Sequence, residues 1–165
     1  ATSNQGAIAW RRGDPATAEA LFLQALAVQR AHGDDRETAG SLNNLGFLYS
    51  TDLADYARSL QSHREALAIR ERLGDRAAIA LSHNNIGIAL TRLRRFDEAE
   101  AHLLRALAER RALGRARRVA STLDNLGDLY QARALAATGA ARARDLDRAL
   151  AVHEESLGIR RGLGD

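Results

Sequence analysis

The stretch Asn43-Asn44-Leu45-Gly46 decides the fold of this chain, because closely related blocks recur along it. The sequence reads Asn-Asn-Ile-Gly at residues 84–87 and Asp-Asn-Leu-Gly at residues 124–127. The glycines stand at positions 6, 46, 87 and 127, which gives spacings of 40, 41 and 40 residues. A repeat of this length predicts stacked units, each of which buries its apolar face against its neighbours.

Two further blocks follow in a fixed order within each unit. Ala25-Leu26-Ala27-Val28 has counterparts at residues 66–69, 106–108 and 156–159, and Leu73-Gly74-Asp75 has counterparts at residues 32–34, 113–115 and 163–165. We therefore divide the chain into repeats at about 1–35, 36–75, 76–115 and 116–165.

Each repeat reads as two helices. In the second repeat Leu42, Leu45 and Leu48 follow the three- and four-residue spacing of a helix with one buried face, which we place at about residues 37–52. A second helix is expected over residues 56–73. Gly74 suits a left-handed cap after that helix, and Asp34 stands three residues before Glu37 at capping-box spacing.

Glycines in the middle of the first helices indicate a close approach between helices. Glycine costs about 1 kcal/mol relative to alanine inside a helix, and this cost is tolerated where two helices must approach closely. We expect the residues that face these glycines to be small ones early in each second helix: Ala18, Ser59, Ala99 and Ala149. The predicted fold is all-α, a right-handed superhelical solenoid of four antiparallel helix hairpins over residues 1–165.

The shared pattern (Leu-Asn-Asn-Leu-Gly, then Leu-Tyr, then Ala-Leu and Leu-Gly) resembles the tetratricopeptide repeat in its long form of about 40 residues. Units of this length are similar to those of kinesin light chains, Pins-type polarity adaptors and the helical regions of bacterial regulators. The resemblance covers essentially the whole chain and implies a scaffold that binds other proteins. Because the sequence begins Ala1-Thr2-Ser3 and contains no methionine, we expect a fragment of a longer regulatory or adaptor protein.

The fourth repeat departs from the others in length. Gly127 and Ser156 are separated by 29 residues, against 20 between Gly46 and Ala66. About ten residues have been added near residues 131–145, an Ala- and Arg-rich stretch. We expect a lengthened hairpin tip, because insertions in repeat proteins map to loops. The alternative is a protruding element that contacts a partner.

Composition excludes several classes of function. All 24 basic residues are arginine, so the pI near 10.1 accompanies a net charge of only +3 and is a poor argument for nucleic-acid binding. There is no cysteine, and no apolar run approaches the roughly eighteen residues that a membrane span requires. The five histidines match no metal-ligand spacing, and no catalytic or cofactor-binding motif is present. We therefore expect neither an enzyme nor a cofactor, and a cytoplasmic location.

A partner would lie against the first helices, which line the inner surface of such a superhelix. By periodicity the residues that face this groove are Asn43, Phe47, Ser50, Asn84, Ile88, Thr91, Arg92, Asp124, Asp128 and Gln131. Asn offers both donors and an acceptor for the backbone of an extended peptide. The resemblance to kinesin light chains implies the same role for Asn43 and Asn84, and it implies that Asn44, Asn85 and Asn125 are structural.

Two other functions stay open at this stage. The last hairpin would expose an apolar face, so an identical chain could cover it and the module would be a homo-oligomer. The basic second half, with 15 arginines against 11 acidic residues in 83–165, would suit nucleic acid, but aromatic residues for stacking are nearly absent there. A protein or peptide partner is the leading prediction.

Overall fold

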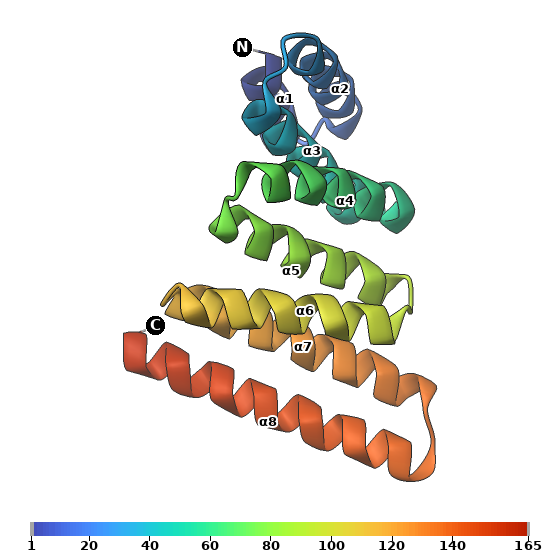
Figure 1. Ribbon diagram of the computed structural model, residues 1–165. Helices are drawn as coiled ribbons and strands as arrows, with labels where there is room; N and C mark the ends of the chain where they lie inside the picture. Colours follow the sequence, from blue (N-terminus) through green and yellow to red (C-terminus); the bar gives the residue numbers. More distant parts are fainter. Residues whose placement is uncertain (1, 165) are drawn as a thin grey trace. The chain divides into compact units, whose positions relative to one another are not determined.

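The computed structural model describes residues 2–164, and these residues form eight α-helices and no strand (Figure 1). The helices are α1 (Thr2–Arg11), α2 (Pro15–Ala31), α3 (Asp35–Thr51), α4 (Tyr56–Leu73), α5 (Arg76–Arg92), α6 (Phe96–Ala112), α7 (Ala116–Ala136) and α8 (Gly139–Leu163). The predicted all-α chain of four helix hairpins is confirmed. The two helices expected in the second repeat are α3 and α4, with bounds within two residues of those predicted.

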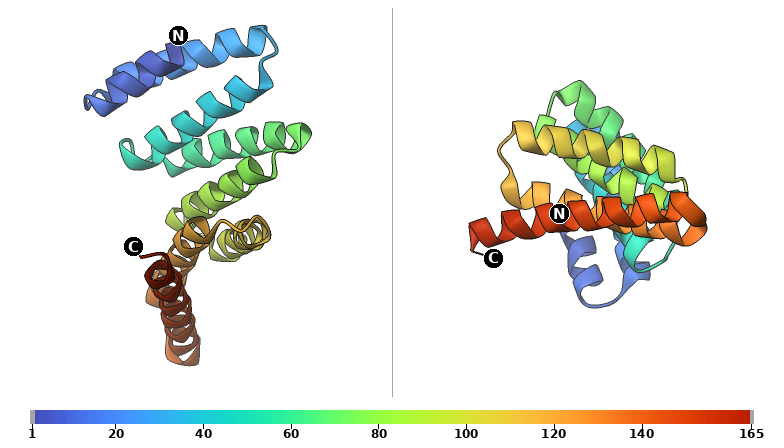
Figure 2. Two further views of the ribbon diagram at one scale, coloured as in Figure 1. Left: turned by 90° about the vertical axis from the view of Figure 1, so that its left-hand side faces the viewer. Right: turned by 90° about the horizontal axis from the view of Figure 1, so that it is seen from below.

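The chain divides into two compact units, residues 1–82 and residues 83–165, and α5 begins in the first unit and ends in the second. In the first unit α2 packs against α1 and α3, and α3 packs against α4. In the second unit α6 packs against α7, and α7 packs along α8, as the two views of Figure 2 also show.

Aliphatic side chains at helical spacing form the core of each unit. In the first unit Leu45 and Leu48 of α3 pack with Phe22 of α2, and all three are almost completely buried. In the second unit the most deeply buried large side chains come from α5, α6 and α7: Ile86, Leu90, Leu103, Leu123, Leu126 and Leu129. The periodicity of the sequence therefore identifies the buried faces correctly.

The predicted caps are confirmed as well. The side chain of Asp34 accepts a hydrogen bond from the backbone N–H of Glu37 at 3.0 Å, which satisfies one free donor of the first turn of α3. Gly74 ends α4 with φ of 67°, in the left-handed region where a side chain would be penalised.

The mid-helix glycines lie against the following helix, but the side chains nearest to them differ from those predicted. Of the predicted residues, Ala99 is close through its carbonyl oxygen, 3.3 Å from a Cβ placed on Gly87. A Cβ placed on Gly46 would come within 2.5 Å of His63, and one on Gly87 would come within 2.5 Å of Leu103. The expected neighbours Ala18, Ser59, Ala99 and Ala149 are buried one turn earlier in the same helices. Helical side chains lean toward the N-terminus of their helix, so the residue one turn later covers the spot above the glycine.

The added residues of the fourth repeat extend its two helices, which differs from the expectation of a longer tip. α7 has 21 residues against 17 in α3, and α8 has 25 against 18 in α4. Only Ala137 and Thr138 lie between α7 and α8, where Figure 1 shows the short connection. Alanine and arginine both favour helix, which explains why this stretch forms added turns and no loop.

An ion pair joins the two extended helices near their connection. Arg133 of α7 donates two hydrogen bonds of 2.9 Å to the carboxylate of Asp145 in α8, and Asp145 is only 3% exposed. Arg133 also pairs with Glu100 of α6 at 2.7 Å. These bonds place the end of α7 with respect to α6 and α8.

Candidate functional site

The predicted groove residues of the first unit share one face of α3. The Phe47 ring meets His63 edge-on, with ring centroids 5.5 Å apart. The Ser50 hydroxyl donates to the Phe47 carbonyl at 2.9 Å, and Asn43 is half-buried and has a bonding partner. All three side chains are half-buried.

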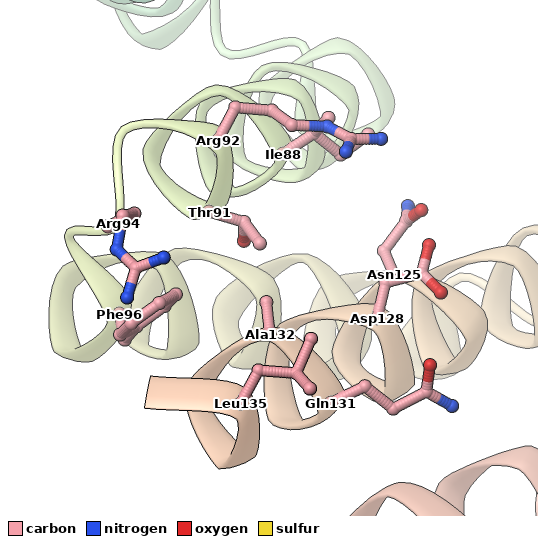
Figure 3. Close-up of a pocket in the computed structure, with 10 residues that line it drawn as sticks. All are labelled: Ile88, Thr91, Arg92, Arg94, Phe96, Asn125, Asp128, Gln131, Ala132 and Leu135. Carbon is pink, nitrogen blue, oxygen red and sulfur yellow. The ribbon is translucent and has the colours of Figure 1, made fainter. Parts of the chain in front are cut away.

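The second unit contains a cavity of about 480 Å³, which we call the α5–α7 pocket (Figure 3). Its lining residues come from α5, the following turn, the start of α6 and α7: Ile88, Thr91, Arg92, Arg94, Phe96, Asn125, Asp128, Gln131, Ala132 and Leu135. Five of the predicted groove residues, Ile88, Thr91, Arg92, Asp128 and Gln131, therefore lie together in one cavity. A cavity of this size suits one or two side chains of a partner.

The pocket combines an apolar surface with opposite charges. Ile88, Phe96 and Leu135 supply apolar surface, and Leu135 is 80% exposed. In Figure 3 Arg92 extends from α5 above the cavity, and Asp128 extends from α7 on the far side of it. The Arg94 guanidinium lies 5.7 Å from the centroid of the Phe96 ring.

Asn84 does not line this pocket, and the structure places it in a buried position. It is 5% exposed, whereas we expected a side chain open to a ligand. Its Oδ1 accepts one hydrogen bond from Arg110 Nη1 at 2.9 Å and another from Asn125 Nδ2 at 3.0 Å. Arg110 reaches Asn84 from α6, 26 positions further along the chain, so helical periodicity could not reveal the contact.

Asp124 also lies outside the pocket. Its carboxylate accepts a hydrogen bond from Arg160 of α8, and His153 Nδ1 lies 3.8 Å from its other oxygen. Burial raises the pKa of Asp124, but the hydrogen bond and the charge of Arg160 help to hold this pKa below its usual value. Arg160 of α8 therefore supplies a positive partner for Asp124 within the chain itself.

A buried arginine supports the α7 side of the pocket. Arg110 is 4% exposed, and its Nη1 also donates to the Arg118 carbonyl at 3.0 Å and to the Thr122 hydroxyl. Burial and the nearby charge of Arg118 lower the pKa of Arg110 to about 10. Arg70 makes the equivalent contact with Ser82 in the first unit at 2.7 Å. The recurrence of Arg and a hydroxyl twelve residues later is a signal that the sequence analysis missed.

Sequence reasoning also missed part of the lining of the pocket. Ala132 and Leu135 belong to the last turns of α7, in or next to the added residues of the fourth repeat. Arg94 and Phe96 lie at the tip of the α5–α6 hairpin and at the start of α6, outside the first helices that we considered. The extension of α7 therefore completes one side of the cavity.

Two classes of site find no support within residues 2–164. No group of three or more His, Asp or Glu side chains is arranged to hold a metal ion in this described part of the chain. Its helices also include none with the length and apolarity that crossing a membrane requires.

Comparison with known proteins connects this arrangement to a repeat family. Residues 1–72 and residues 79–116 match the sequence profiles of the tetratricopeptide repeat. The crystal structure of BtubC (BKLC) from P. vanneervenii is similar with a TM-score of 0.85 and 25% sequence identity. The alignment covers 99% of this chain and 63% of BtubC, so this chain spans less than two thirds of that protein. A search of curated proteins gives no match.

Proposed function

Because the chain belongs to the tetratricopeptide repeat family, whose members are generally protein–protein interaction modules, we propose that it binds a peptide segment of another protein in the α5–α7 pocket. The observation that carries this proposal is the cavity of about 480 Å³ that collects five residues predicted as ligand contacts from the sequence. Apolar surface and a few polar groups are the usual combination in sites that take side chains of a partner.

The predicted contacts have different roles in this proposal. Ile88, Thr91, Arg92, Asp128 and Gln131 would touch the peptide directly. Asn84 and Asp124 would not touch the peptide, because their side chains are already bonded to Arg110 and Arg160. They would instead help to position the residues that do. Asn43, Phe47 and Ser50 of α3 would form a separate contact surface in the first unit.

Selection of peptides from a random library on the complete chain tests the proposal. Leu135→Ser should weaken the binding of the selected peptides about tenfold or more, because the leucine side chain is largely exposed and lines the pocket. Leu104→Ser is the matched control, since Leu104 is 46% exposed on α6 and does not line the pocket. Equal binding to both variants would refute the α5–α7 pocket as the site.

Self-association is a second candidate function, and a row of leucines on α8 favours it. Leu146, Leu150 and Leu157 are between 46% and 59% exposed and follow four- and seven-residue spacing on one helix face. A second copy could cover this face. Sedimentation of the chain at rising concentration tests the idea, and a monomer at all concentrations, unchanged by Leu150→Glu, would reject it.

A further inference from the structure

Three polar residues of α7 share the side of the helix that faces the α5–α7 pocket. Asn125, Asp128 and Gln131 are spaced by three residues, and Figure 3 shows all three at the same side of the cavity. The bonds that each makes elsewhere decide which atom it offers to a ligand.

The orientation of the Asn125 amide follows from Arg110. An arginine can only donate, so the atom of Asn84 that receives the Arg110 hydrogen bond must be Oδ1. The atom of Asn125 that meets the same oxygen at 3.0 Å must then be the donor Nδ2. Asn125 therefore keeps its Oδ1 as an acceptor. Arg110 is a positioning residue that acts on the pocket through Asn84.

The Gln131 amide is oriented in a similar way from α8. The amide nitrogen of Gln131 can only donate, and it lies 3.2 Å from His153 Nε2, which is therefore the acceptor. Gln131 consequently keeps its Oε1 as an acceptor.

Asp128 adds a negative charge between these two acceptors. Its side chain is exposed, and no arginine lies within ion-pair distance of it among residues 2–164. The α7 side of the pocket thus offers three acceptors: Asn125 Oδ1, the Asp128 carboxylate and Gln131 Oε1. Such a row binds N–H donors, and a guanidinium or ammonium group best of all.

The opposite side of the pocket carries the opposite charge. Arg92 is exposed on α5 and makes no ion pair within the described residues, and Arg94 adds a second guanidinium against Phe96. Ile88 of α5 and Leu135 of α7 add apolar surface to the same pocket. A ligand that fits must therefore present an anion toward α5 and a cation toward α7.

We infer that the α5–α7 pocket selects an extended peptide in which an acidic and a basic residue stand next to each other and are flanked by an apolar residue. This inference rests on the proposed function and names the chemistry of its partner. Successive side chains of an extended segment point to opposite sides, so adjacent opposite charges would face Arg92 and Asp128 respectively. The apolar neighbour would pack on Ile88, Phe96 and Leu135.

Four synthetic peptides test the inference with the complete chain. The parent is acetyl-Gly-Leu-Glu-Arg-Leu-Gly-amide, and Gln replaces Glu, Arg or both in the others. Binding is followed by amide chemical shifts of the ¹⁵N-labelled protein. Each peptide charge should tighten binding about two- to fivefold, as exposed ion pairs do. In the Asp128→Asn variant, peptides with Arg should bind no more tightly than those with Gln at that position, while the preference for Glu remains. In the Arg92→Gln variant, the preference for Glu over Gln should disappear, while the preference for Arg remains.

Two controls keep the outcomes separate. Asp147→Asn removes an exposed carboxylate of α8 outside the pocket and should leave all four affinities unchanged. Arg110→Met should reduce the preference for peptides with Arg over those with Gln, but should preserve the preference for Glu. A general loss of stability would not change one preference and spare the other. Its folding is checked by circular dichroism.

The results distinguish this inference from the proposed function. If the doubly neutral peptide binds at the pocket as tightly as its parent, the charge pattern is refuted and peptide binding stands. If no peptide shifts the pocket resonances at millimolar concentration, both are refuted. Loss of the advantage of Arg in the Asp147→Asn variant would also contradict the assignment to Asp128.

Discussion

The imidazole of His63 packs directly on Gly46: a Cβ placed on this glycine would lie 2.5 Å from His63 Cε1 and 2.6 Å from Nε2. His63 is 2% exposed, and the backbone of α3 can approach α4 closely because position 46 lacks a side chain. This contact joins the two helices of the second repeat.

Replacing Gly46 by alanine should therefore destabilise the chain although alanine favours helix. The overlap with the His63 ring should cost about 1–3 kcal/mol, more than the roughly 1 kcal/mol that alanine contributes inside a helix. Gly40→Ala in the same helix is the control, because no atom lies within 4 Å of its built Cβ. Urea unfolding should show opposite signs for the two variants, and equal stabilisation would contradict the close contact.

The stability of the first unit should fall in acid because of His63. Burial, together with the charge of Arg70, lowers the pKa of His63 to about 4 from 6.5. The unfolded chain binds this proton more readily, so the contribution is fully present above pH 6.5 and is lost as pH falls toward 4. The loss should approach about 3 kcal/mol. Thermal unfolding between pH 7.5 and 4.5 measures it.

Two variants of His63 provide the control for this pH dependence. Phe22 and Leu103 occupy the equivalent positions against Gly6 and Gly87. His63→Phe and His63→Leu should therefore fold and should lose less stability between pH 6.5 and 4.5 than the natural chain. An unchanged slope in both variants would assign the acid sensitivity to other groups.

The ion pair between Arg133 and Asp145 should be needed for the extended α7–α8 hairpin. Asp145→Ala removes the buried partner of the half-buried Arg133, which keeps only its other acid partners, and should cost about 3 kcal/mol. Hydrogen exchange should quicken first in the opening turns of α8. Asp147 is exposed and lies two residues away, so Asp147→Ala should change the free energy of unfolding by no more than about 0.5 kcal/mol. It should also leave hydrogen exchange in α8 unchanged. Equal protection in both variants would contradict this role.

Replacing Arg94 by glycine should raise the stability of the chain and weaken its binding of peptides. Its φ of 59° lies in the left-handed region, where Gly13 stands at the tip of the first hairpin with φ of 78°. Arg94→Gly should stabilise the chain by about 1 kcal/mol, measured by thermal unfolding. The same variant should weaken peptides that carry an acidic residue. Loss of stability in the variant would indicate that the contact with Phe96 outweighs the backbone strain.

Much of the fold could be predicted because the information is local. Repeat spacing located the hairpins, and the Asp34 and Gly74 caps followed from their neighbours in sequence. To predict which side chain lies against each glycine, one must know that helical side chains lean toward the N-terminus. We therefore predicted Ser59 as the neighbour of Gly46, whereas His63, one turn later, is the side chain in contact. The extension of α7 and α8 depends on the pairing of Arg133 with Asp145, which no periodicity reveals.

The candidate site was only partly predictable for the same reason. Helical periodicity grouped Ile88, Arg92 and Asp128, and these three residues lie in one cavity. It could not show that Arg110 comes from another helix to bury Asn84. Phe96 was missed because it begins a second helix, and Leu135 because it lies in the added turns of α7.

The lengths of α7 and α8 imply a rule for how this hairpin can vary. They exceed α3 and α4 by four and seven residues, which are close to one and two full turns. Such additions change the rotational phase of the following residues by only about 40° and 20°, so each buried face stays aligned. Adding a single residue would rotate the face by about 100° and turn Asp145 away from Arg133. Natural variation in length at this point should therefore occur in steps of three or four residues.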